Sequence, residues 1–143
     1  DNNRHQVIKT TVDGKVLLTL DYPEETGQYT NAEEYVPTET IIAPNGDIYV
    51  ADGYGKDFVI QYDHKGNYIR HFAGRGEGDK YVVNTHGICI DNRDKNNPCL
   101  IVTSRVQNAF KRYTFAGRLL KAITCMSPCS KLMPGWMKNR VLY

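Results

Sequence analysis

The sequence predicts an all-β protein that repeats a unit of four short strands. Ten Tyr and twelve Gly occur among the 143 residues, and this composition favours short strands with tight turns because aromatic and β-branched side chains suit a pleated sheet. Three segments, at 7–17, 60–69 and 111–120, each consist of a strand, a glycine turn and a second strand. Their turn glycines are Gly14, Gly66 and Gly117, so the pattern recurs about every 50 residues, the length of a four-stranded unit.

A second predicted hairpin precedes the last two of these segments. The first example, at 40–52, carries the Asn45-Gly46 turn between apolar runs, which is the strongest short-range signal for a hairpin. Its counterpart, at 87–102, has a longer polar loop. Each complete repeat therefore has two inner apolar strands and two outer strands with more alternation, the composition and size of a β-propeller blade.

The repeats divide the chain, residues 1–143, into parts of a propeller. We expect the outer strands of one blade at 5–21, a full blade at 38–74, the next blade at 85–122, and a linker with the start of a further blade at 123–143. One blade cannot bury both faces of its sheet, so blades must stack, and propellers close with four to eight of them. About two and a half to three blades are present, and we expect the rest from the same full-length protein or from another chain.

Charge and hydropathy exclude two classes of partner. The chain has 18 basic and 16 acidic side chains without a basic patch, so we expect no nucleic acid partner. Its longest apolar runs, such as 81–83 and 100–102, are far shorter than the roughly 20 residues that cross a bilayer. The chain starts without Met or an apolar signal core, so we expect an N-terminus that was processed or cut from a longer chain.

The four cysteines are Cys89, Cys99, Cys125 and Cys129. Their spacing matches no familiar zinc motif, and their number alone leaves the redox compartment open. The hairpin at 87–102 predicts that Cys89 and Cys99 lie on adjacent antiparallel strands of one blade. Their proximity would permit a disulfide without requiring one.

Several motifs resemble a known family. The segment 37–54, which ends in Asp52-Gly53-Tyr54, together with 60–62 and His86-Gly87-Ile88, resembles NHL-repeat propellers. More narrowly, it is similar to the peptidyl-α-hydroxyglycine α-amidating lyases (peptidylamidoglycolate lyases) and their bacterial relatives. The likeness extends from about His5 to Leu120. Gly55 stands where animal members have a disulfide-forming Cys, which favours a microbial relative.

The resemblance implies a six-bladed propeller that cleaves the N–Cα bond of a C-terminal α-hydroxyglycine and releases a peptide amide and glyoxylate. Its substrate is the C-terminus of a peptide or a related small molecule, and its setting is extracytoplasmic, periplasmic or secreted. The family holds zinc through three His from different blades, and Ca²⁺ is a further cofactor of the complete propeller. His86 matches a zinc-binding His, Tyr54 the catalytic Tyr, and Arg105 a cavity Arg, although Ser104 replaces the acidic residue before it.

Physical chemistry gives these three residues a consistent set of roles. A neutral imidazole suits zinc, a Tyr phenol near a cation can serve as a base, and a guanidinium fits a carboxylate. In a propeller, His86 would begin a channel-lining strand, and its counterpart in the preceding blade would be Thr38. Tyr54 and Arg105 would each follow the second strand of a blade, so all three could meet at the channel mouth.

Simpler interpretations stay open for each residue. His86 could line the channel and bond only backbone or water, Tyr54 could pack on the blade rim, and Arg105 could be a solvated loop residue. The corresponding alternative function is a non-catalytic NHL propeller that binds a peptide, glycan or protein partner. A third alternative is a structural subunit of a larger assembly.

Overall fold

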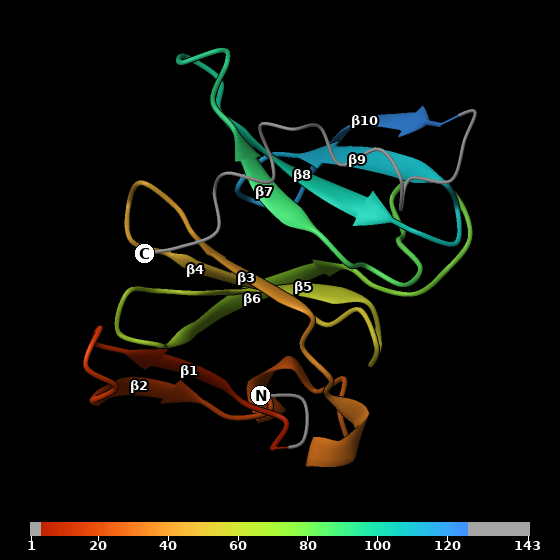
Figure 1. Ribbon diagram of the computed structural model, residues 1–143. Coiled ribbons are helices and arrows are strands. Elements are labelled where there is room, and N and C mark those ends of the chain that lie inside the picture. Colours follow the sequence, from red (N-terminus) through yellow and green to blue (C-terminus); the bar gives the residue numbers. More distant parts are fainter. Residues whose placement is uncertain (1–3, 126–143) are drawn as a thin grey trace.

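The computed structural model describes residues 4–125, and the regular secondary structure within them is almost entirely β-strand (Figure 1). Most of the segment 123–143, predicted as a linker and the start of a further blade, lies outside these residues. Two short 3₁₀ helices, η1 (Glu24–Thr26) and η2 (Ala32–Glu34), are the helical elements of the described part. No helix within it has the length and apolar character to cross a membrane.

Within residues 4–125, ten strands form three antiparallel sheets. The N-terminal hairpin contains β1 (Val7–Thr10) and β2 (Val16–Leu20). The middle sheet contains β3 (Glu39–Ile42), β4 (Ile48–Ala51), β5 (Phe58–Tyr62) and β6 (Tyr68–Ala73). The C-terminal sheet contains β7 (Ile88–Asp91), β8 (Cys99–Ser104), β9 (Ala109–Tyr113) and β10 (Leu119–Thr124). Strands that follow one another in the chain are neighbours in each sheet, and the prediction of an all-β protein is confirmed.

The turn glycines explain why these hairpins form where they do. Gly14, Gly46, Gly66 and Gly117 all have left-handed backbone, with φ between 83° and 91°, a conformation that glycine adopts without steric cost. At the β3–β4 turn, the Asn45 side chain also accepts a hydrogen bond from the backbone N–H of Asp47, at 3.1 Å. Local chemistry therefore fixes the loops, and the loops fix which strands pair.

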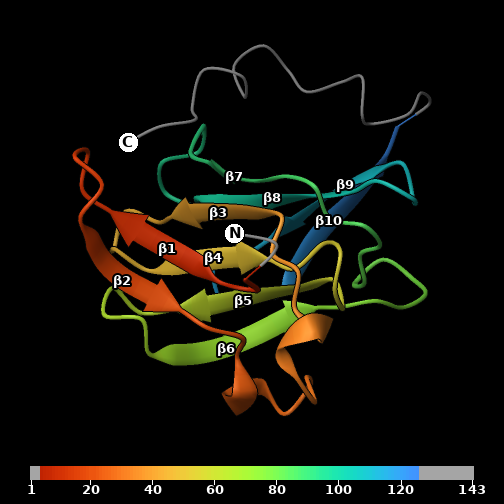
Figure 2. The ribbon, with the colours of Figure 1, turned by 60° about the horizontal axis from the view of Figure 1, so that its bottom comes forward.

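Two apolar clusters hold the three sheets face to face. Leu20 from β2 packs with Ile48, Val50 and Ile60 between the N-terminal hairpin and the middle sheet. Between the middle and C-terminal sheets, the buried residues are Ala43, Tyr49, Ala51, Val59, Val82, Ile88, Leu100, Val102 and Tyr113. The sheets are consequently stacked in chain order, and β3 and β7 lie side by side (Figure 2).

The predicted arrangement of Cys89 and Cys99 on adjacent antiparallel strands is confirmed. In the register of β7 and β8, Cys89 lies opposite Ile101, and Cys99 lies opposite Asp91. The two cysteines are therefore diagonal neighbours, whose Cα atoms are typically about 7–8 Å apart, whereas a disulfide prefers about 5.5–6 Å. Both are present as thiols.

Candidate functional site

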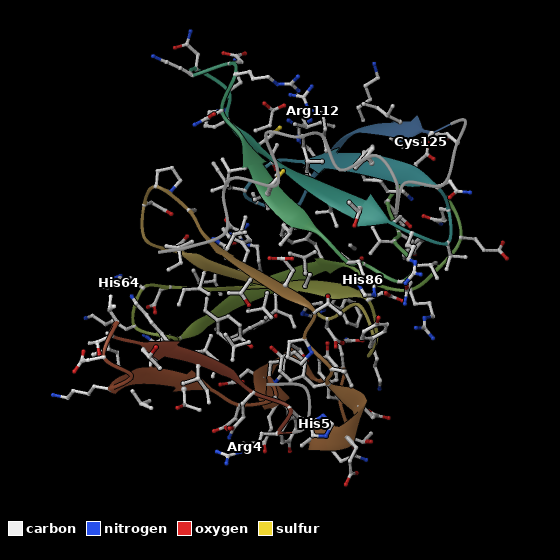
Figure 3. The ribbon with its side chains drawn as sticks, in the orientation of Figure 1. Arg4, His5, His64, His86, Arg112 and Cys125 are labelled. Atoms are coloured by element: carbon white, nitrogen blue, oxygen red, sulfur yellow. The ribbon has the colours of Figure 1, made fainter. Side chains whose placement is uncertain are left out.

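The rings of Tyr54 and His86 meet where the middle and C-terminal sheets join. Tyr54 follows β4, and His86 stands just before β7. Their ring centroids are 4.5 Å apart with planes at 81°, an edge-on contact. Figure 3 shows His86 between the two sheets. His86 is half-buried, whereas Tyr54 is 50% exposed, so the pair lies at the surface with its Tyr side open to solvent.

His86 offers a neutral imidazole with an unused nitrogen. Its Nε2 atom is buried and has no hydrogen-bond partner among residues 4–125. Burial lowers the pKa of His86, and the nearby positive charge of Arg105 lowers it further. Near neutral pH the ring is therefore uncharged, the state in which a His nitrogen can bind a metal or accept a proton. The backbone N–H of His86 donates to Thr103 Oγ1 at 3.3 Å.

Arg105 contributes an exposed guanidinium close enough to influence His86. It directly follows β8, and its backbone N–H donates to the carbonyl oxygen of Asn84 at 3.3 Å. The structure thus brings together all three residues that the sequence singled out: Tyr54 and His86 in direct contact, Arg105 through its charge.

Tyr54 and Arg105 occupy positions that differ by one residue between the middle and C-terminal sheets. In the middle sheet, the backbone N–H of Tyr54 donates to the carbonyl oxygen of Val36. In the C-terminal sheet, the equivalent bond runs from the N–H of Val106 to the carbonyl oxygen of Val83. Val106 is therefore the counterpart of Tyr54, and Arg105 corresponds to Gly53. The sequence comparison of the repeats, which treated Tyr54 and Arg105 simply as residues following a second strand, did not resolve this offset.

Ser104 takes over the backbone contact that a carboxylate makes in the middle sheet. Its Oγ accepts a hydrogen bond from the N–H of Val83 at 2.9 Å. In the middle sheet, Asp52 Oδ1 accepts the corresponding bond from Val36 at 2.7 Å. Burial raises the pKa of Asp52 even though Lys56, Tyr29 and Val36 all hydrogen-bond it. The substitution of the expected acid by Ser104 therefore preserves the local structure while removing a buried carboxyl group.

A close backbone contact fixes the distance between the two halves of the site. Gly53 packs so tightly on Thr85 that a Cβ at Gly53 would come 1.6 Å from the Thr85 carbonyl oxygen. Thr38 Oγ1 donates to that same carbonyl at 2.7 Å and accepts from the N–H of Gly53 at 3.2 Å. Thr38, the expected counterpart of His86 in the preceding blade, thus lies at the junction and forms hydrogen bonds to both sides of it.

Asp57 is a site residue that the sequence did not indicate. Its buried carboxylate accepts hydrogen bonds from the backbone N–H groups of Asn84, at 2.7 Å, and Thr85, at 3.3 Å. Arg75 Nε donates to its other oxygen at 2.8 Å. Because Asn84 lies 27 residues downstream, no local pattern in the sequence could reveal these contacts.

The described residues supply one strong candidate metal ligand in the site. No group of three or more His, Cys, Asp or Glu side chains within residues 4–125 has an arrangement that could hold a metal ion. The labelled histidines His5, His64 and His86 are spread over the molecule (Figure 3). His86, with its unpartnered Nε2, fits one position of a zinc site, and further ligands would have to come from outside this part of the chain.

Comparison with known proteins adds no family assignment: no family model and no curated protein matches the sequence. The fold and the site define the chain as an all-β protein of stacked antiparallel sheets, with a Tyr–His contact and a nearby Arg at one junction between sheets.

Proposed function

We propose that this chain is part of an NHL-type β-propeller that is six-bladed when complete. The proposal is supported by two successive four-stranded antiparallel sheets whose strands are ordered as in the chain. The N-terminal hairpin matches the outer half of such a sheet, because Gly14 occupies the turn position of Gly66 and Gly117. β3 and β7, the first strands of the two sheets, are neighbours, as the innermost strands of adjacent blades would be.

The complete protein would act as a zinc-dependent lyase on a C-terminal α-hydroxyglycine or a related α-hydroxy compound. One observation carries this proposal: the edge-on contact of Tyr54 with His86, whose Nε2 atom is left without a partner among residues 4–125. His86 Nε2 would be one zinc ligand. When bound, zinc would act as a Lewis acid toward the substrate's hydroxyl oxygen.

The chain's own residues would bind the substrate and move one proton. Arg105, exposed beside His86, would hold the substrate carboxylate through its planar fork of donors. Tyr54 Oη would act as the general base that accepts the proton of the substrate hydroxyl. The hydroxyl oxygen then forms a carbonyl as the N–Cα bond breaks, and the departing nitrogen takes up a proton, giving an amide and glyoxylate.

A second candidate function is non-catalytic recognition of a peptide, glycan or protein partner. It is favoured by the exposure of both Tyr54, at 50%, and Arg105, because Tyr and Arg are enriched among the residues that dominate binding interfaces. Such a role would need neither zinc nor proton transfer.

Zinc titration and glyoxylate release distinguish the two functions. Calorimetry with Zn²⁺ should show His86→Ala binding at least 10- to 100-fold more weakly, and the exposed-turn variant His64→Ala unchanged. Tyr54→Phe should bind zinc normally yet lose about 10²- to 10⁴-fold of the glyoxylate release from an α-hydroxyglycine peptide. Equal zinc affinity in His86→Ala and the unmodified protein would overturn the lyase proposal.

A further inference from the structure

We propose that Asp57 is a positioning residue that holds His86 against Tyr54. The importance of this role for catalysis rests on the proposed function, whereas the contacts that define it do not. Asp57 is fully buried, directly before β5. Its Oδ1 atom accepts hydrogen bonds from the backbone N–H groups of Asn84 and Thr85, the two residues that precede His86. A carboxylate on one side of the junction thereby orders the backbone on the other.

Asp57 and Gly53 bracket Tyr54 in the sequence, and both are bonded to the segment that leads into His86. Asn84 Nδ2 donates to the carbonyl oxygen of Gly53 at 3.3 Å. Gly53 also packs on the Thr85 carbonyl without room for a side chain. The loop that carries Tyr54 is thus fastened to the segment before His86 at both ends, which fixes how the two rings meet.

The backbone of Asn84 shows that this segment needs external support. Asn84 has φ +58°, a left-handed conformation that non-glycine residues adopt infrequently, with Asn among the more tolerant. Its own N–H is one of the two that Asp57 binds. Without an acceptor, these backbone donors at the junction would be left unsatisfied, which is unfavourable in a buried position.

The second carboxylate oxygen of Asp57 has a separate partner. Arg75 Nε donates to Oδ2 at 2.8 Å, and another Arg75 nitrogen donates to the carbonyl oxygen of Gly55 at 3.2 Å. The Arg75 side chain is 61% exposed, so its positive charge balances the buried carboxylate of Asp57 from the solvent side. Because each oxygen serves a different contact, the ordering of Asn84 and Thr85 can be tested separately from the ion pair.

The left-handed backbone of Asp57 itself, with φ +64°, determines which variants are informative. Asn and Gly both tolerate this conformation, whereas Ala would add strain unrelated to the carboxylate. Asp57→Asn keeps an oxygen acceptor for the two N–H groups, and Asp57→Gly removes it. Asp63→Gly is the matched control, because Asp63 also accepts two backbone N–H bonds, from Lys65 and Asn67 in an exposed turn.

The primary measurement is the nuclear Overhauser effect between the Tyr54 and His86 rings in zinc-free protein, followed by Zn²⁺ affinity. In folded Asp57→Gly we expect the ring–ring signal to disappear and zinc affinity to fall about 10- to 100-fold. Asp57→Asn should stay within about threefold of the unmodified protein because its acceptor remains, and Asp63→Gly should be unchanged. A folded Asp57→Gly protein with the signal and zinc affinity intact would overturn the proposal.

Two further outcomes keep the inference separate from the lyase proposal and from simple unfolding. If the unmodified protein binds no zinc but Asp57→Gly still loses the ring–ring signal, the positioning role stands and the lyase proposal fails. If Asp57→Gly does not fold, amide hydrogen exchange in the unmodified protein decides: slow exchange at both Asn84 and Thr85 supports the role, and fast exchange at both overturns it.

Discussion

The carbonyl oxygen of Thr85 occupies the space that a side chain on Gly53 would need, since a Cβ there would come within 1.6 Å of it. This contact joins the loop that carries Tyr54 to the residue before His86. Because the obstructing atom belongs to the backbone, a side chain at position 53 can be accommodated only if the two sheets move apart.

Gly53→Ala should therefore destabilise the protein by at least about 2 kcal/mol, at the upper end of what overpacking a rigid interior typically costs. Urea denaturation gives the free energy of unfolding. The control is Gly27→Ala, where no atom lies within 4 Å of the new Cβ, so the left-handed backbone with φ +64° is the source of strain, and where we expect a loss of about 1 kcal/mol. Equal losses in the two variants would contradict the close contact.

Arg105→Gln should raise the pKa of His86, because the positive charge that disfavours the imidazolium is removed. The pKa should still stay below the ordinary value of 6.5, since burial is the larger cause of the shift and remains. NMR titration of the His86 ring protons measures this directly, with Arg118→Gln, in the exposed β9–β10 turn, as a control that leaves His86 unchanged. An unaltered or lowered pKa in Arg105→Gln would contradict the influence of the Arg105 charge on His86.

Asp91→Asn should destabilise the protein by about 1 kcal/mol at neutral pH, the scale of a salt bridge with an exposed partner. Arg93 binds both oxygens of Asp91, at 2.7 and 2.8 Å, and lowers its pKa to about 2. The lowered pKa makes this stabilisation fully present above the unfolded-state value of about 3.9, and it is lost as pH falls through about 2. The unfolding curves of the two proteins should converge there; a constant gap down to that pH would exclude the mechanism.

Cys89 should react slowly with iodoacetamide at pH 8, and its rate should rise about tenfold per pH unit as the thiolate forms. Burial raises the pKa of the Cys89 thiol to about 11. Peptide mass spectrometry locates the modified residue, and the same chain unfolded in urea serves as the reference. Rapid modification of the folded protein at pH 8 would show that the thiol is not held in this environment.

The fold could be predicted to the extent that its signals are local. Turn glycines such as Gly46 and Gly66, with apolar residues on either side, specify hairpins within a dozen residues, and the hairpin at 87–102 fixed the pairing of β7 with β8. The propeller arrangement, by contrast, depends on how sheets continue beyond the described residues, and it stays a prediction.

The candidate site, like the fold, has a part that the sequence indicates and a part that only the structure reveals. Tyr54 and His86 were singled out because their motifs resemble those of a family. The structure shows their rings in contact, and their functional roles stay a prediction. Asp57 was not found, because an Asp before a strand is unremarkable until the amides of Asn84 and Thr85 are seen to point at it. Ser104 stands where the resemblance implies an acid, and the bond from the Val83 N–H shows that its hydroxyl makes the contact that the Asp52 carboxylate makes in the middle sheet.

Because every strand in the middle and C-terminal sheets pairs with its immediate predecessor or successor, each sheet can complete its hydrogen bonding as soon as its own stretch of chain has been synthesised. The last strand of the middle sheet ends at residue 73, and the first strand of the C-terminal sheet begins at residue 88. Such sequence-local pairing lowers the loop-closure entropy that slows most β-proteins. A ribosome-bound nascent chain would therefore acquire its structure one sheet at a time, with each finished sheet offering an apolar face on which the next can assemble.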